Sequence, residues 1–182
     1  MLGKSNGKII YFLDSDDFFK KNKLKVVSNY FEKNKNLNLL LDTPQVYFNS
    51  KKKFKMKIKK RSKYLIPWIK FPSQSCFAVR KKYLNKIFKK IKVNKFPDIW
   101  LDFRIIIQAI IDNEEIKILN RSLTFYRQSQ NMESSKFKKF SLNWWKRRKQ
   151  AYSFFKYLSK KNKTKLNFSI DEYFTNIINK FI

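Results

Sequence analysis

Hydrophobic and polar positions along this chain switch between two periods, and the switch predicts a succession of strands and helices. Residues 7–14 (GKIIYFLD) are a short β-branched and aromatic run that ends in Asp, which is typical of a buried strand. Residues 17–34 carry apolar side chains at helical spacing, which predicts a helix with an Asp available to cap it. The pattern at this end of the chain is therefore strand, acidic turn, helix.

The middle of the chain continues with short strands. Residues 37–49 predict one or two strands around the break at Pro44, and the lysine-rich residues 51–63 predict an exposed hairpin or loop. Residues 74–80 predict a strand that runs directly into a helix.

The second half of the chain is predicted to be mainly helical. Residues 97–112 form an apolar helix pattern, in which Pro97 suits the first turn because no amide donor is needed there. Residues 115–127 predict a final strand, and residues 136–182 predict two helices separated by residues 160–169. Strands that alternate with helices indicate an α/β layered fold.

The charge of the chain changes this picture, because 43 Lys and Arg stand against 13 Asp and Glu, a formal net charge of +30. Such a surface attracts nucleic acid, phosphorylated small molecules and anionic lipid headgroups. The lysines are spread along the whole chain, so a generally solvated basic surface explains them as well as a dedicated polyanion site does.

Composition also excludes several kinds of chemistry. The chain has no His and one Cys, Cys76, which excludes His-based triads, HExxH metal sites, Cys-based zinc clusters and disulfides, and fits a reducing compartment. Only Gly3 and Gly7 are glycines, so dinucleotide and P-loop fingerprints are absent. No apolar run approaches the ~18 residues that span a bilayer, which predicts a cytoplasmic protein. Acid–base chemistry must therefore use carboxylates.

The acidic turn DSDD places Asp14, Asp16 and Asp17 after the first predicted strand. One interpretation is that Asp16 or Asp17 caps the following helix while the others face solvent. A calcium-binding EF-hand loop is excluded, because Phe19 stands where Gly is needed and Lys25 where Glu is needed. The other interpretation is a divalent metal site, since two carboxylates on one turn can converge on a hard ion that binds a diphosphate.

The stretch GKIIYFLDSDDFF resembles the strand and acidic turn of family 2 glycosyltransferases, which have the GT-A fold. Two later segments resemble the same family in the same order. PDIWLDFR resembles the helix start that carries the general base, and SLTFYR resembles a strand ending in Tyr-Arg. The matching positions are Asp98, Leu101 and Arg104 in the first segment and Leu123, Tyr126 and Arg127 in the second. We expect Arg104 to form a structural ion pair.

The resemblance implies an enzyme that transfers a sugar from a nucleotide-diphospho-sugar donor to a saccharide or lipid-linked acceptor, with inversion, and that depends on a divalent metal, Mg²⁺ or Mn²⁺. It also implies the roles of individual residues. These are metal binding by Asp14 and Asp16 with Asp17 as alternate, base catalysis by Asp98 with Asp102 as alternate, and phosphate binding by Arg127 and Tyr126.

The resemblance further implies a partial GT-A mixed sheet flanked by helices over residues 1–135, followed by a basic, aromatic helical extension over residues 136–182. In the family, a nucleotide-binding region precedes the acidic turn, which here stands at residue 14. We therefore expect a chain that lacks that region and is truncated or inactive on its own.

The extension contains Trp144, Trp145, Arg147 and Arg148 within a dense basic run. An amphipathic helix lying on the inner face of the membrane is one interpretation, and a core-packing helix with a solvated basic face is the other. The alternative function is a non-catalytic basic protein that binds nucleic acid through charge and aromatic stacking. A transferase would not need nucleic acid as a partner.

Overall fold

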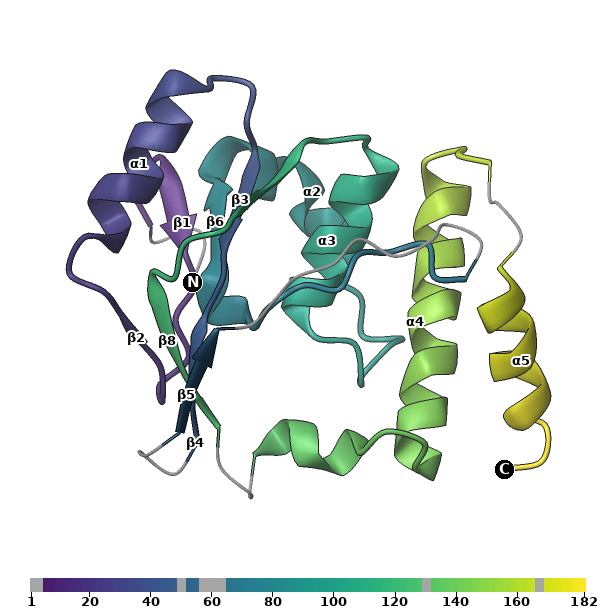
Figure 1. The fold of residues 1–182 in the computed structure, drawn as a ribbon. Helices are drawn as coiled ribbons and strands as arrows, with labels where there is room; N and C mark the ends of the chain where they lie inside the picture. Colours follow the sequence, from purple (N-terminus) through teal and green to yellow (C-terminus); the bar gives the residue numbers. More distant parts are fainter. Residues whose placement is uncertain (1–4, 49–51, 56–64, 129–131, 166–168) are drawn as a thin grey trace. The chain divides into compact units, whose positions relative to one another are not determined.

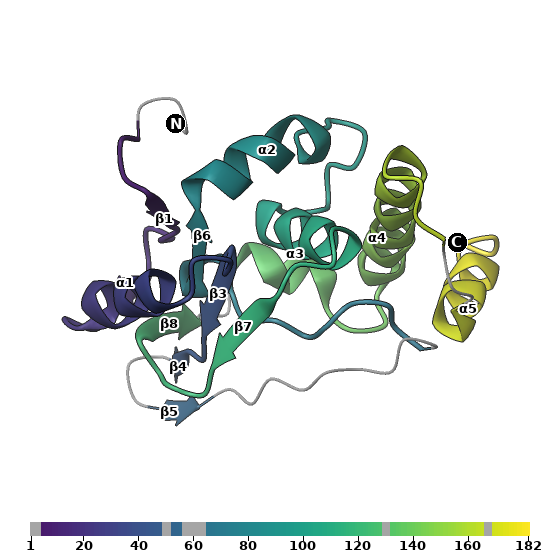
Figure 2. The ribbon, with the colours of Figure 1, turned by 90° about the horizontal axis from the view of Figure 1, so that it is seen from above.

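The computed structural model describes residues 5–48, 52–55, 65–128, 132–165 and 169–182 (Figures 1 and 2). The chain forms two compact units. Unit 1 comprises Met1–Ile58, Phe71–Lys89 and Asp112–Ser129, and unit 2 comprises Lys59–Lys70, Lys90–Ile111 and Gln130–Ile182. Each unit is therefore built from segments that are distant in the sequence, and the two are described separately below.

Unit 1 contains two four-stranded sheets. The strands of the first sheet, in spatial order, are β1 (Ile9–Tyr11), β6 (Phe77–Arg80), β3 (Leu39–Asp42) and β7 (Ile116–Leu119). Those of the second are β2 (Phe18–Phe19), β8 (Thr124–Gln128), β4 (Gln45–Phe48) and β5 (Lys52–Lys55). The pairs β3–β7 and β4–β8 are parallel and the others antiparallel. The sheets are mixed, as the α/β prediction requires.

Two of the places where the chain passes from one sheet to the other, between β3 and β4 and between β7 and β8, lie side by side because β3 pairs with β7 and β4 with β8. Thr43 fastens these crossings together, since its Oγ1 donates to the carbonyl of Leu119 (2.5 Å) and its amide donates to that of Arg121 (3.3 Å). The single strand predicted over residues 115–127 is therefore wrong. It is two strands, because the chain bends between them to follow β3 and β4.

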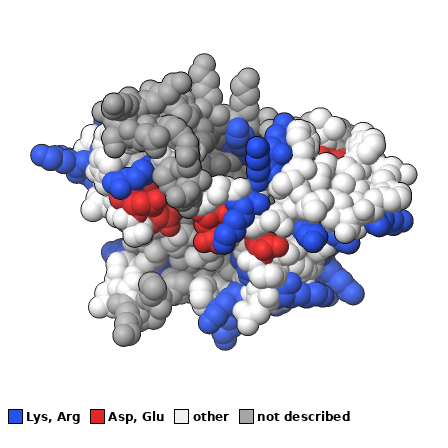
Figure 3. Space-filling model, turned by 90° about the horizontal axis from the view of Figure 1, so that it is seen from below, with Lys and Arg blue, Asp and Glu red and all other residues white. Residues whose placement is uncertain are grey.

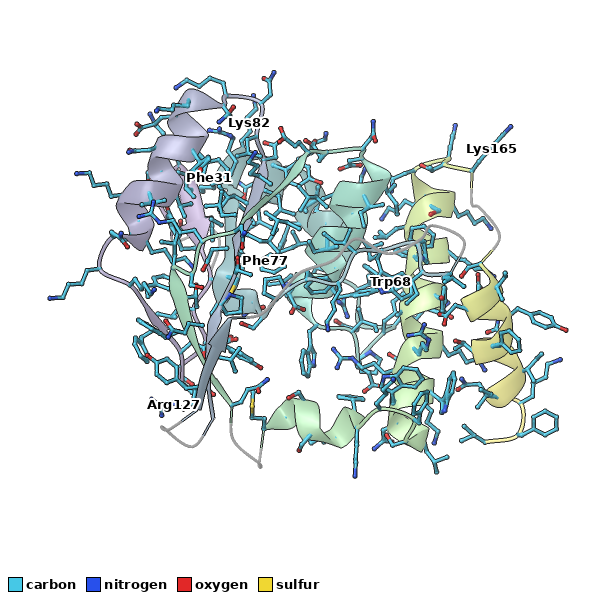
Figure 4. The ribbon with its side chains drawn as sticks, viewed as in Figure 1. Phe31, Trp68, Phe77, Lys82, Arg127 and Lys165 are labelled. Carbon is cyan, nitrogen blue, oxygen red and sulfur yellow. The ribbon has the colours of Figure 1, made fainter. Side chains whose placement is uncertain are left out.

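Helix α1 (Lys23–Lys33) covers the first sheet with Val27 and Phe31, which pack in one buried cluster with Leu40 and Ala78 (Figure 4). The helix begins six residues later than the predicted start, because residues 18–19 pair with β8 instead. Its N-cap residue is Asn22, so the acidic turn does not cap it.

Helix α2 (Lys81–Ile91) follows β6 without a break, as predicted. Of the lysine-rich segment predicted as a hairpin or loop, residues 52–55 are strand β5, and residues 51 and 56–63 lie outside the described residues.

Unit 2 contains α3 (Leu101–Ile111), the short 3₁₀ helix η3 (Glu133–Phe137), α4 (Leu142–Lys161) and α5 (Ile170–Ile178). The two C-terminal helices were predicted. Aromatic contacts hold α3 and α4 together: the ring of Trp68 lies 5.3 Å from Phe103 and 4.8 Å from Tyr152, centre to centre. In the described part of the chain, no helix is both long and apolar enough to cross a membrane.

Arg104 determines where α3 begins. Its guanidinium donates to the carbonyls of Ile91, Val93, Phe96 and Ile99, each at 2.7 Å. These contacts hold residues 92–100 in an irregular loop between α2 and α3, so the helix predicted from residue 97 starts at Leu101. Arg104 is thus structural, as expected, but it binds backbone carbonyls rather than a carboxylate.

Candidate functional site

The acidic turn of residues 14–17 connects β1 to β2 in unit 1. The amide of Asp17 donates to the carbonyl of Asp14 (3.1 Å), which closes the turn. The amide of Asp14 donates to Ser75 Oγ (3.0 Å), and Gln74 Nε2 donates to Asp14 Oδ1 (3.2 Å). The turn is thereby attached to η2 (Gln74–Cys76), the 3₁₀ turn that leads into β6.

Asp17 is the buried member of the turn, with 8% of its surface exposed, whereas Asp16 is exposed. Its Oδ1 accepts a hydrogen bond from the amide of Arg127 (2.9 Å). Its Oδ2 is buried and has no hydrogen-bond partner among the described residues. Burial raises the pKa of Asp17, the nearby Ser75 hydroxyl and the Arg127 amide lower it, and the charges of Asp16 and Asp14 raise it again.

Strand β8 brings Tyr126 and Arg127 to this turn, although 110 residues separate Arg127 from Asp17. Burial, together with the negative charges of Asp17, Asp16 and Asp14, raises the pKa of Tyr126 to about 12, and a hydrogen bond with Gln128 opposes that rise. The Arg127 side chain is exposed near the end of β8 (Figure 4). The hydrogen bond from the Arg127 amide to Asp17 and the effect of the turn's negative charges on Tyr126 therefore connect two segments that lie far apart in the sequence.

A buried ion pair is connected to the turn through Ser75, and the sequence pattern did not predict it. Lys23 Nζ lies 2.9 Å from Asp42 Oδ1, and both side chains are fully buried. Lys23 Nζ also donates to the carbonyl of Ser75 (2.7 Å) and to Thr124 Oγ1 (2.6 Å). Ser75 thus links the ion pair to the acidic turn. Its backbone carbonyl accepts from Lys23, and its side-chain oxygen accepts from the amide of Asp14.

Asp42 completes this network by accepting hydrogen bonds from Thr124 Oγ1 and from the amide of Leu123, both at 2.9 Å. A signal was present in the sequence. Lys23 stands four positions before Val27 and eight before Phe31, so it lies on the buried stripe of its helix. A lysine on such a stripe needs a buried acidic partner.

In unit 2, Asp98 lies in the turn before α3, not in the first helical turn as predicted. Gln150 of α4 holds it with two reciprocal hydrogen bonds. Gln150 Nε2 donates to Asp98 Oδ2 (2.6 Å), and the Asp98 amide donates to Gln150 Oε1 (3.1 Å). Helix α4 therefore fixes both the backbone and the carboxylate of Asp98.

Asp102 occupies the first turn of α3 and is 8% exposed. Arg147 is the cation near both carboxylates of this region: burial lowers the pKa of Arg147, while Asp102 and Asp98 raise it. Its guanidinium lies 4.0 Å from the ring centre of Trp100. Asp98, Asp102, Arg147 and Gln150 thus form one polar group within unit 2.

The remaining residues predicted for a membrane surface are partly engaged inside unit 2. The rings of Trp144 and Trp145 are half-buried and pack edge to face at 4.6 Å. Arg148 forms an ion pair with Asp171 of α5. Other side chains form the exposed apolar surface of this unit, as described below.

The residues of the acidic turn fit a hard divalent cation. Among the described residues, no three or more His, Cys, Asp or Glu side chains cluster in a way that could hold a metal on their own. The turn nevertheless supplies oxygen donors only, and it leaves one buried carboxylate oxygen, Asp17 Oδ2, unsatisfied. An ion bound here would need further oxygen ligands from a substrate or water.

The predicted site residues form two groups, one in each unit. Unit 1 brings together Asp14, Asp16, Asp17, Tyr126 and Arg127, and unit 2 brings together Asp98, Asp102 and Arg147. On the face shown in Figure 3, Asp and Glu side chains form small groups among the Lys and Arg side chains. Carboxylates are thus concentrated locally despite the net charge of +30.

Comparisons with known proteins give a family match and a likeness of fold. The family model for glycosyl transferase family 2 matches residues 1–88, the part that contains the acidic turn and Ser75. Among solved structures, the fold is similar to that of S. aureus TarS, residues 1–349, in complex with UDP-GlcNAc. The TM-score is 0.53 at 15% identity, over 96% of this chain and 47% of the TarS chain. The chain therefore spans about half the length of that structure. No curated protein matches the sequence.

Proposed function

Because the chain is family 2 glycosyltransferase-like, by its match over residues 1–88 and by its GT-A-like fold, we propose that it carries the metal, diphosphate and base residues of a nucleotide-sugar glycosyltransferase. The reaction is transfer of a sugar from a nucleoside-diphosphate donor to a hydroxyl group, with inversion.

One observation carries the proposal: the hydrogen bond from the Arg127 amide to Asp17 Oδ1 at 2.9 Å. It joins the acidic turn to the Tyr126-Arg127 pair, two segments that carry the family resemblance. The pairing of β2 with β8 brings these segments together, and the Asp17 carboxylate attaches the turn to the Arg127 backbone. A binding site for a metal-complexed diphosphate needs both carboxylates and a cation.

In this proposal, Asp14 and Asp16 hold a Mg²⁺ or Mn²⁺ ion, and the buried Asp17 orients the turn through Arg127 and offers an alternate oxygen ligand. The ion, when bound, neutralises negative charge that develops on the departing diphosphate. The exposed guanidinium of Arg127 and the hydroxyl of Tyr126 bind diphosphate oxygens.

Asp98 accepts the proton of the acceptor hydroxyl as that oxygen attacks the sugar. A base must face the proton that it accepts, and the Gln150 amide that donates to Asp98 Oδ2 at 2.6 Å holds this carboxylate in one orientation. Arg147, close to Asp98 and Asp102, adds positive charge to the same region. Asp102, buried in the first turn of α3, is the alternate base.

The acceptor we propose is a saccharide or a lipid-linked saccharide, and the place of reaction is the cytoplasm, with contact at the inner face of the membrane. The basic surface favours a phosphorylated or anionic carrier, since a net charge of +30 attracts such groups.

The first prediction concerns the acidic turn. Titration calorimetry of the full chain with Mn²⁺ and UDP together should show binding that Asp14→Asn and Asp16→Asn each weaken at least about tenfold, because each removes a charged oxygen ligand. UDP is the probe because it carries the diphosphate without a transferable sugar.

The matched control is Glu32→Gln, which makes the same charge change at an exposed position of α1. It should leave the affinity unchanged. Equal weakening by Glu32→Gln would mean that bulk charge causes the effect. Unchanged binding in both turn variants would remove the metal role of the turn.

A further inference from the structure

Helix α5 packs on α4 with its polar face and turns its apolar face outward. Asp171 pairs with Arg148 and with the hydroxyl of Tyr152, and Glu172 Oε1 lies 2.6 Å from Lys156 Nζ. Amphipathic helices of globular domains normally do the reverse and bury the apolar stripe.

Further contacts on the same side confirm this orientation. Thr175 is fully buried, and Asn179 Nδ2 donates to the carbonyl of Trp145 (3.1 Å). Together with Asp171 and Glu172, these residues recur at helical spacing along one side of α5. That side is therefore held by hydrogen bonds and ion pairs instead of apolar packing.

The opposite side of α5 is its outer face, which consists of Ile170, Tyr173, Phe174 and Ile177. Ile170 is 44% exposed, Tyr173 57% and Phe174 55%. Aromatic side chains project from α5 on the side away from α4 (Figure 4). Adjacent exposed apolar side chains of this kind mark a surface that binds a protein or a membrane.

The apolar surface continues beyond the outer face of α5. The contact between Asn179 and Trp145 brings the end of α5 to the start of α4. There Phe140, which packs against Trp144 at 5.4 Å, is 63% exposed, and Leu142 is 60% exposed. The part of Figure 3 that holds α5 is mainly white, with blue at its margins.

The charges near α5 indicate which kind of partner its outer face binds. Residues 136–182 contain thirteen Lys and Arg and two acidic residues, Asp171 and Glu172. Both acids pair with α4, whereas Lys163 and Lys165, which precede α5, and Lys180, which follows it, are exposed. An apolar face rimmed by cations is complementary to an anionic lipid surface, which offers apolar chains beneath negative headgroups.

A second copy of the chain fits the same face poorly. Symmetric pairing would bring two strongly basic surfaces together, each from a chain of net charge +30, and they would repel. Helix α5 is nine residues long, so it can lie in a membrane interface but cannot cross it.

We propose that the outer face of α5, extended by Phe140 and Leu142, binds the surface of a membrane that contains anionic lipid. Tyr173 and Phe174 enter the headgroup region, and the surrounding lysines contact lipid phosphates. This inference rests on the membrane contact included in the proposed function and assigns it to a surface. Because the binding needs neither metal nor sugar transfer, its failure is distinguishable from failure of the proposed chemistry.

The experiment is co-sedimentation of the full chain with vesicles of phosphatidylcholine, with and without phosphatidylglycerol. We expect binding only when phosphatidylglycerol is present, and a loss of at least about tenfold in partitioning for Tyr173→Ser/Phe174→Ser, because two aromatic anchors are removed. Both replaced side chains are exposed, so the fold should be retained.

The control is Leu24→Ser/Tyr30→Ser, which removes two exposed apolar side chains from α1 and should bind as the original chain does. Three results would overturn the proposal. The chain does not sediment with anionic vesicles, the Tyr173/Phe174 variant binds unchanged through its lysines alone, or the chain without vesicles forms a dimer that this variant dissolves. The last result would assign the face to a second copy.

Discussion

Gln150 is the residue that most directly shapes the candidate base. Its amide contacts both the backbone and the carboxylate of Asp98, from a helix that lies 52 residues further along the chain. One of these bonds reaches the carboxylate and the other holds the backbone beside it, so the carboxylate keeps one orientation, whereas a free one samples several rotamers. The base therefore depends on α4, so residues beyond the predicted boundary at 135/136 belong to the proposed chemistry.

Gln150→Leu should lower the rate of sugar transfer about 10- to 100-fold, since a hydrogen bond to a charged group contributes about 1.5–3 kcal/mol. Affinity for Mn²⁺ and UDP, measured by calorimetry, should stay unchanged, because Gln150 is far in sequence from the acidic turn and makes no contact with it among the described bonds.

The matched variant is Asn143→Leu, an exposed position of the same helix, which should keep the original rate. If Gln150→Leu transferred sugar at the original rate, Asp98 would not need this contact, and Asp102 would become the better candidate for the base.

At the scale of elements, a buried ion pair joins α1 to the crossing between the two sheets of unit 1. Lys23 belongs to α1, Asp42 ends β3, and Thr124 begins β8. Lys23 and Asp42 neutralise each other's charge, and both form hydrogen bonds with neighbouring polar groups. Removal of one of them therefore leaves a buried charge without compensation. The same network bonds Ser75, the residue that anchors the acidic turn.

Lys23→Met should lower the free energy of unfolding by about 3–5 kcal/mol, because it leaves the buried Asp42 carboxylate without its cation. Lys25→Met, an exposed position on the same helix, should change it by less than about 0.5 kcal/mol. Urea denaturation followed by far-ultraviolet circular dichroism measures both. Equal stability of the two variants would contradict the structural role assigned to the pair.

For the molecule as a whole, charge is the dominant property. A net charge of +30 repels itself in the compact state and attracts any polyanion. Nucleic-acid binding is thus an expected general property of this surface, and by itself it does not support the alternative function of a dedicated nucleic-acid binder. The discriminating variant is Asp16→Asn, which should weaken binding of Mn²⁺ with UDP and leave RNA binding unchanged.

Salt should stabilise the chain. Raising sodium chloride from low to high concentration shortens the screening length and reduces the self-repulsion of the folded state. The melting temperature should therefore rise by several degrees, since 1 kcal/mol corresponds to about 2–4 °C at this size. Differential scanning fluorimetry with chloride salts measures it. A melting temperature that falls with salt would indicate that attractive ion pairs outweigh the repulsion.

The sequence by itself determined what depends on neighbouring residues and on composition. It predicted the first strand, the acidic turn, the strand that runs into a helix after residue 74 and the two C-terminal helices, because side-chain periodicity is a local property. That strand starts at Phe77, three residues later than predicted, because residues 74–76 form a 3₁₀ turn. The absence of His restricted the chemistry to carboxylates, and three spaced segments resembled the family whose model matches residues 1–88, the part that contains the first of them.

Only the tertiary structure decided which segments meet. The contact of Asp17 with Arg127, the pairing of Lys23 with Asp42 and the hold of Gln150 on Asp98 each join residues far apart in sequence, and periodicity carries no information about such partners. The orientation of α5 is the clearest example. Its amphipathic pattern separates a polar from an apolar face without showing which one packs, and ion pairs of Asp171 and Glu172 with α4 turn the apolar face outward.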